Sequence, residues 1–230
     1  MNQVNRKSIE THQRHPGWRC GLAFAATLLA LTIQAQELSA NVRLLNAART
    51  GDEAGARQAL RDGAASNARN RLGETALLVA LKNERPRMAE QMIDAGTDVN
   101  LAAVNGITPL MAAAHSGQSE IVRSLIAKGA DPNAVDRLKK NAMTYAAGQG
   151  QTSVVELLLQ AGIDPNAVYV HELTALMWAA GYGKTETVKL LLDAGARADL
   201  KDDRGKTALD IAREGNYAAT AELLAASTRR

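Results

Sequence analysis

The chain has 230 residues, of which 46% are hydrophobic and only 3% aromatic, and its formal net charge is +3. The excess of positive charge lies in residues 1–35, and residues 36–230 contain equal numbers of basic and acidic residues. This balance does not support a nucleic-acid partner, which would need a basic surface. The only cysteine, Cys20, lies in the same N-terminal segment, so residues 36–230 can form no disulfide and no thiolate site.

The N-terminal segment has the order of a secretory signal peptide. Residues 1–20 are polar and basic, residues 21–35 form an apolar run, and Ile33-Gln34-Ala35 provides a small-residue cleavage pattern. The run is shorter than the roughly 20 residues that span a bilayer. We therefore predict a signal peptide over residues 1–35, cleavage after Ala35, and a periplasmic or secreted protein. The alternative is an uncleaved N-terminal anchor, and only in that case do we expect membrane contact.

The chain from position 36 to position 230 is built from a repeating unit of about 33 residues. Glycine recurs at this interval at Gly63, Gly96, Gly129, Gly162 and Gly195. Three further ladders keep the same phase, namely Thr75, Thr108, Thr174 and Thr207; Leu77, Leu110, Leu176 and Leu209; and Ala80, Ala113, Ala146, Ala179 and Ala212. Such self-similarity predicts a tandem array whose stacked units share one core. The predicted units cover residues 36–67, 68–100, 101–133, 134–166, 167–199 and 200–230.

The unit at residues 105–133 shows the expected local structure. A short helix follows Thr108, whose side chain can cap it, and Pro109 is tolerated in the first turn. Gly117 suits the end of this helix, because glycine adopts positive φ at low cost. A second amphipathic helix follows and ends at Gly129.

This unit resembles the ankyrin repeat. The resemblance rests on Thr108-Pro109-Leu110, on the related Thr-Ala-Leu triplets at 75, 174 and 207, and on phrases such as Gly129-Ala130-Asp131-Pro132-Asn133. It implies an all-α solenoid of about six helix-turn-helix units with short extended turns. It also implies a protein that binds a partner protein. We further expect a monomer that needs no cofactor.

Some positions depart from the family pattern. Asn141 replaces the capping threonine, and Lys139 and Glu172 replace the turn glycine found at Gly73, Gly106 and Gly205. We expect Asn141 to retain the cap and the turns at Lys139 and Glu172 to be strained or reshaped. The first and last units have small residues where the middle units have bulky ones, so we expect both to act as caps.

The sequence offers no catalytic constellation. The two histidines after residue 35, His115 and His171, are far apart and do not have metal-site spacing. Asp131 and Asp164 could be taken for an acid–base pair, but we interpret them as turn residues that accept local backbone hydrogen bonds. We therefore predict neither an enzyme nor a metal site.

The resemblance implies a binding face made of the turn tips and the ends of the first helices. The candidate partner-binding residues are Leu72, Val104, Asn105, Ile107, His115, Arg137, Leu138, Lys140, Tyr169, Val170, His171, Leu173 and Tyr182. Apolar residues are frequent at these tips, and an apolar stripe on a solvated surface indicates a partner. The alternative is that the tips pack on each other along the stack.

The aromatic residues after position 35 all lie between Tyr145 and Tyr217. Tyr145 and Trp178 occupy equivalent positions one repeat apart, and we leave open whether they pack between helices or contact a partner. Tyr and Trp are enriched at binding hot spots. Of the four residues, we expect Tyr169 and Tyr182 to be the better candidates for exposed contacts.

The functional hypothesis is a non-catalytic, exported scaffold or regulator of a partner protein. The alternatives are a secreted effector that acts on a host protein, self-assembly through the end caps, and a small-ligand-binding protein or enzyme with an unrecognised site.

Overall fold

The computed structural model describes the backbone of residues 17–227 and the side chains of residue 32 and residues 34–227. This part of the chain is helical, with no β-strand beyond isolated bridges between Arg69 and Thr75 and between Val168 and Thr174. Its elements are α1 (Gly17–Thr50), α2 (Glu53–Arg61), α3 (Ala76–Lys82), α4 (Pro86–Asp94), α5 (Pro109–His115), α6 (Ser119–Ala127), α7 (Ala142–Gln149), α8 (Thr152–Gln160), η1 (Val170–Glu172), α9 (Ala175–Gly181), α10 (Thr185–Asp193), α11 (Ala208–Glu214) and α12 (Ala218–Ser227). Residues 1–16, which include much of the predicted basic region, lie outside the described residues.

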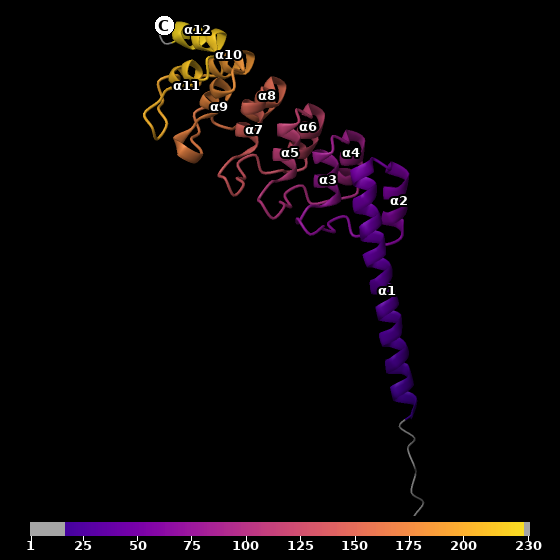
Figure 1. Cartoon of the computed structure of the whole chain (residues 1–230). Coiled ribbons are helices and arrows are strands. Elements are labelled where there is room, and N and C mark those ends of the chain that lie inside the picture. The colour runs from indigo at the N-terminus through magenta and orange to yellow at the C-terminus, as the bar shows by residue number, and fades with distance from the viewer. Residues whose placement is uncertain (1–16, 228–230) are drawn as a thin grey trace, which may run out of the picture.

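The helices form consecutive pairs that stack into a two-layered solenoid (Figure 1). The first helices, α1, α3, α5, α7, α9 and α11, pack side by side in one layer, and α2, α4, α6, α8, α10 and α12 form the other. Loops between successive pairs project from the first-helix side (Figure 1). The predicted all-helical solenoid of helix-turn-helix units is therefore confirmed.

Side-chain caps start the first helices where the threonine ladder predicts them. The Thr108 Oγ1 accepts a hydrogen bond from the Met111 amide at 3.2 Å, and the other threonines of the ladder make the same contact. Asn141 retains the cap, since its Oδ1 accepts a hydrogen bond from the Thr144 amide at 3.0 Å. These contacts satisfy amides that have no partner within the helix.

The glycine ladder ends the second helices with a backbone conformation that other residues rarely adopt. The φ angles of Gly63, Gly96, Gly129, Gly162 and Gly195 lie between 76° and 92°. A Cβ added at these positions would meet no atom within 4 Å. The positive φ, rather than lack of space, therefore selects glycine here.

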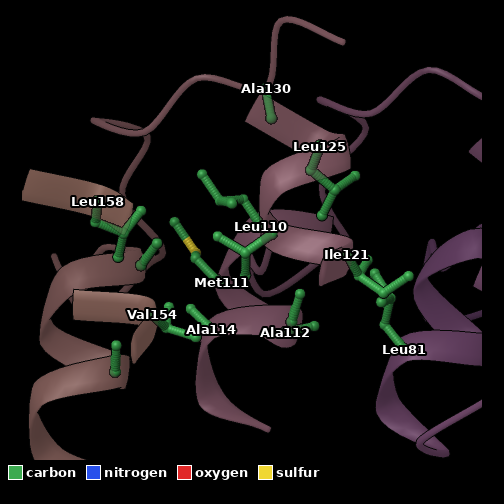
Figure 2. Close-up of a cluster of buried hydrophobic side chains, with 14 of the residues drawn as sticks. Leu81, Leu110, Met111, Ala112, Ala114, Ile121, Leu125, Ala130, Val154 and Leu158 are labelled. Carbon is green, nitrogen blue, oxygen red and sulfur yellow. The ribbon is translucent and has the colours of Figure 1, made fainter. Parts of the chain in front are cut away.

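The core is one continuous cluster that runs along the stack. Figure 2 shows Leu81 of one repeat, Leu110 and Leu125 of the next, and Leu158 of the third within this cluster. The alanine ladder of the first helices is completely buried. Because alanine has a small side chain, neighbouring first helices can approach closely, and the bulkier leucines fill the space between the two layers.

Asparagines of the turn phrase join neighbouring repeats. The Asn166 Oδ1 accepts a hydrogen bond from the Arg197 amide at 2.7 Å, and its Nδ2 donates to the Gly195 carbonyl at 3.2 Å. Asn100 makes the equivalent two bonds between earlier repeats, at 2.8 and 3.0 Å. At Asn100 and Asn166, the phrase that identifies the repeat in the sequence thus joins one unit to the next.

The first helix is longer than the repeat requires. α1 continues without interruption across Ala35 and Gln36, the predicted cleavage site, and its N-terminal part projects away from the stack (Figure 1). Within the part of the chain that the structure describes, no helix is long and apolar enough to cross a bilayer. The unit boundaries and the cleavage at Ala35 stay predictions.

Candidate functional site

Five loops project beside the first helices, and we call them fingers. They are numbered by repeat: finger 2 spans 70–74, finger 3 spans 103–107, finger 4 spans 136–140, finger 5 spans 169–173 and finger 6 spans 202–206. Equivalent positions in successive fingers are separated by one repeat length. We call the fingers, together with the adjoining exposed side of α3, α5, α7, α9 and α11, the finger face.

The first residue of a finger organises its turn when it carries a side-chain acceptor. In finger 4, the Asp136 Oδ1 accepts hydrogen bonds from the Leu138 and Lys140 amides at 2.8 and 2.9 Å. Asn70 and Asp202 bond the corresponding amides of fingers 2 and 6 in the same way. Such turns hold the tip in a fixed shape through local contacts.

The carboxylate of Asp202 is stabilised in its charged form. Burial alone would raise the pKa of this carboxyl. The hydrogen bonds from the Lys206 amide and from the guanidinium and amide of Arg204 outweigh burial, so the pKa lies below its ordinary value. Finger 6 is therefore held by an ionised side chain.

The fourth residue of each finger adopts a left-handed conformation. Glycine occupies this position in fingers 2, 3 and 6, whereas Lys139 and Glu172 hold it with φ of 58° and 57°. Left-handed backbone costs a non-glycine residue roughly 1–2 kcal/mol. The expectation that these two turns are strained is confirmed.

Finger 5 differs from the others in a second way. Tyr169 occupies the first position and cannot accept the turn hydrogen bonds; its hydroxyl instead lies 3.1 Å from the Asn141 Nδ2 of the preceding repeat. His171 joins Glu172 in the left-handed region, and the tip forms the short helix η1. Tyr169 is half-buried. Tyr169 is therefore not fully exposed as predicted, since its hydroxyl is bonded to the preceding repeat, and its contact with a partner stays a prediction.

Backbone hydrogen bonds join several fingers, while the apolar tips remain exposed. The amide of Val104 donates to the carbonyl of Leu72 at 2.9 Å, and the amide of Arg137 donates to the backbone carbonyl of Asn105 at 3.1 Å. Leu72, Val104 and Leu138 are nevertheless 62%, 54% and 62% exposed. The tips thus pack on each other through their backbones, and their apolar side chains stay available.

A row of rings and one cation lies beside the fingers. The Lys140 Nζ is 4.4 Å from the centre of the Trp178 ring and 5.9 Å from that of Tyr145, which are cation–π contacts. Trp178 stacks on Tyr182 with ring centres 6.2 Å apart, and His115 meets Tyr145 edge to face at 5.8 Å. Tyr145 and Trp178 therefore belong to the finger face rather than only to helix packing.

Tyr145 is fixed as a neutral hydrogen-bond donor. Its hydroxyl donates to the Asp136 Oδ2 at 2.6 Å. Burial and the neighbouring carboxylate both raise the pKa of the Tyr145 phenol far above its ordinary value. This contact connects the first helix α7 to the base of finger 4.

Two hollows open on the finger face. One, of about 330 Å³, is lined by Lys82, Asn105, Ile107, Met111, Ala112, His115, Ser116 and Tyr145. The other, of about 380 Å³, is lined by Arg137, Leu138, Lys139, Lys140, Val170, His171, Leu173 and Trp178. A third hollow of about 430 Å³ lies between α10 and α12, and no predicted site residue lines it.

The structure brings all thirteen predicted residues to this face, in two degrees of exposure. The exposed ones are Leu72, Val104, Asn105, His115, Arg137, Leu138, His171 and Tyr182, and the half-buried ones are Ile107, Lys140, Tyr169, Val170 and Leu173. The predicted set omits Lys139 and Trp178, which line the second hollow. The sequence signal for Trp178 is its alignment with Tyr145 one repeat earlier. The signal for Lys139 is the absence of the turn glycine at its position.

The acidic turn residues have the structural role that the sequence indicates. The Asp131 Oδ1 accepts a hydrogen bond from the Asn133 amide at 2.9 Å, and Asp164 bonds the Asn166 amide at 2.8 Å. Among the described residues, no cluster of three or more His, Cys, Asp and Glu side chains could hold a metal ion.

Comparison with protein families decides the classification. The model described as ankyrin repeats (3 copies) matches residues 44–136, 86–169 and 143–229. The chain belongs to the ankyrin-repeat family. A comparison with curated proteins finds no significant match. Ankyrin repeats are protein–protein interaction modules and are generally non-catalytic, and the ankyrin fingers described above supply exposed apolar and aromatic side chains for such contacts.

Proposed function

We propose that this ankyrin-repeat protein is an exported scaffold or regulator that binds a partner protein through its finger face. The observation that carries the proposal is the exposure of apolar tips, above all Leu138, beside the ring cluster of Tyr145, Trp178 and Tyr182. Tyr and Trp are enriched at protein–protein hot spots, and exposed apolar residues beside them indicate a partner. The repeat array supplies a rigid support, since its fingers are fixed by local hydrogen bonds.

Export is inferred from the N-terminal sequence. The basic segment, the apolar run and the pattern that ends at Ala35 have the order of a signal peptide. N-terminal sequencing of the protein from the periplasmic fraction and from the culture medium tests this. The expected mature chain begins at Gln36. A chain that retains residues 1–35 would contradict cleavage, and accumulation only in the medium would favour a secreted effector.

Affinity capture from a cell-envelope extract tests binding. The binding variant is Leu138→Glu combined with Leu173→Glu, which places two carboxylates on the finger face. The control is Ala127→Glu combined with Gln160→Glu, which adds the same charge at exposed positions of α6 and α8 in the other layer. We expect the first variant to lose the captured partner and the control to retain it. If both retain every partner, the finger face is not the binding surface.

We propose that the protein acts as a monomer. Light scattering over a concentration series tests this against self-assembly through the end caps. A constant mass supports the proposal, and a mass that rises with concentration contradicts it.

A further inference from the structure

The backbone bonds between fingers are interrupted at one place. The amide at the second position of a finger donates to the carbonyl at the third position of the preceding finger, as Val104 does to Leu72, Arg137 to Asn105 and Asp203 to His171, at 2.9–3.1 Å. The equivalent pair between fingers 4 and 5 is the Val170 amide and the Leu138 carbonyl. Across the described residues 136–173, neither group has a hydrogen-bond partner. A backbone donor and a backbone acceptor are therefore left free at this junction.

The interruption coincides with a reshaped tip in finger 5. Tyr169 supplies no side-chain acceptor for the turn, and both His171 and Glu172 take left-handed φ angles of 57°. Fingers 4 and 6 begin with an aspartate. Each has a single residue with left-handed φ, which is Lys139 in finger 4 and Gly205 in finger 6. The reshaped tip of finger 5 thus fails to pair with finger 4.

The hollow of about 380 Å³ opens at this same junction. Its apolar walls are Leu138 of finger 4, Val170 and Leu173 of finger 5, and the Trp178 ring. Its size and apolar lining suit one or two side chains of a bound segment. Unpaired backbone groups at its edge suit the main chain of an extended segment, as in recognition by strand addition.

Cations dominate the charge of this hollow. Arg137, Lys139 and Lys140 line it, and no carboxylate does. Within the described chain, the Arg137 and Lys139 side chains have no ion-pair partner. Fingers 5 and 6 carry the exposed acids Glu172 and Asp203, and the Asp203 carboxylate is 2.8 Å from the His171 Nδ1. Asp136 of finger 4 is buried and accepts a hydrogen bond from the Tyr145 hydroxyl.

We propose that the gap between fingers 4 and 5 seats an extended segment of the partner protein in which an acidic side chain adjoins an apolar one. This inference rests on the proposed function and names the partner chemistry. The apolar side chain enters the hollow between Leu138 and Trp178, and the carboxylate meets Arg137 and Lys139. The main chain of the segment bonds the Val170 amide and the Leu138 carbonyl.

Selection from a random displayed-peptide library on the whole folded protein tests the partner chemistry. We expect enriched peptides to contain Asp or Glu next to a large apolar residue. Arg137→Glu should lower the affinity for an enriched synthetic peptide by about tenfold, which corresponds to a loss of about 1.4 kcal/mol of binding free energy. Arg71→Glu is the matched control, because Arg71 holds the same position in finger 2, and it should leave the affinity unchanged. Peptides without acidic residues, or equal losses in the two variants, would overturn the proposal.

Amide hydrogen exchange tests the free backbone groups. An exposed amide without a partner exchanges faster than one in a hydrogen bond. In the free protein, Val170 should exchange faster than Val104, Arg137 and Asp203, and the bound peptide should slow it. Equal protection at all four amides in the free protein would overturn the interrupted ladder.

A variant that restores the finger 5 turn tests whether the gap is the binding site. Tyr169→Asp combined with Glu172→Gly gives finger 5 the aspartate and the glycine that finger 6 has as Asp202 and Gly205. We expect this variant to protect the Val170 amide and to bind the selected peptide at least about tenfold more weakly. Unchanged exchange in α7 and α9 would show that it remains folded. Full peptide affinity together with a protected Val170 would refute the gap as the binding site.

The two proposals fail separately. If Leu138→Glu with Leu173→Glu abolishes partner capture but the library yields no acidic–apolar peptides, the finger face remains the binding surface and the inferred partner chemistry is wrong. If neither experiment shows an effect, both proposals are wrong.

Discussion

Leu158→Ala is the most informative test of the stacked core. Leu158 is completely buried in α8, which packs between α6 and α10. Its cluster extends into the preceding repeat through Leu110 and Leu125 (Figure 2). The substitution removes about three carbon groups from a site that is enclosed on both sides along the stack.

The expected loss has two parts. Transfer of the removed groups out of water contributes about 2.4 kcal/mol at about 0.8 kcal/mol for each carbon. The residual cavity adds to this, because the helices on either side of α8 hold its walls in place, and measured Leu→Ala losses in cores span about 2–5 kcal/mol. We expect Leu158→Ala to lower the free energy of unfolding by about 3–5 kcal/mol.

Leu224→Ala is the matched control at the end of the array. Leu224 is the equivalent residue two repeats later and is also completely buried, but no repeat follows α12 in the described chain. This helix can move inward, so we expect the loss to stay near the transfer value of about 2.4 kcal/mol. Urea denaturation monitored by far-ultraviolet circular dichroism measures both. Equal losses would refute the stacked core with end caps.

Three further predictions concern local contacts. Glu84→Gly should raise the free energy of unfolding by about 0.5–1 kcal/mol, because Glu84 holds a left-handed φ of 53° where the next repeat has Gly117; urea midpoints that fall instead would contradict this. Asn166→Ala should lower the free energy of unfolding by about 1–2 kcal/mol, because it removes two inter-repeat hydrogen bonds. Asn133→Ala is the control and should leave that free energy almost unchanged, since the described structure gives the Asn133 side chain no hydrogen bond. Because the Asp202 pKa is lowered on folding, its contribution is present above its unfolded pKa and lost as the pH falls through the lowered folded value. The stability gap between wild type and Asp202→Asn should therefore close in acid, and a pH-independent gap in thermal unfolding would contradict the charged cap.

The fold could be predicted because each repeat position has a local physical requirement. The capping threonines, the left-handed glycines and the small buried alanines recur with the period of the repeat, and the structure assigns each ladder one role. The extent of α1 could not be predicted in this way. Its length beyond the first repeat depends on residues before position 36, which have no repeat ladder, so the sequence contains no stop signal there.

The site could be predicted only in part. Exposed tips such as Leu138 follow from the repeat register, and the strained turns follow from Lys139 and Glu172 in place of glycine. The half-burial of Tyr169 depends on its contact with Asn141 across two repeats. The interrupted bond between fingers 4 and 5 coincides with that contact and with two successive left-handed residues, and a single sequence position does not reveal such a combination.

The central claim is that the finger face binds the partner. Hydroxyl-radical footprinting of the whole protein, free and with its captured partner, tests this most directly because it reports side-chain exposure. We predict reduced labelling at Leu138, His171 and Tyr182 in the complex, and unchanged labelling of the exposed side chains of α6 and α8. Reduced labelling on α6 and α8, with unchanged labelling at Leu138 and Tyr182, would contradict the claim.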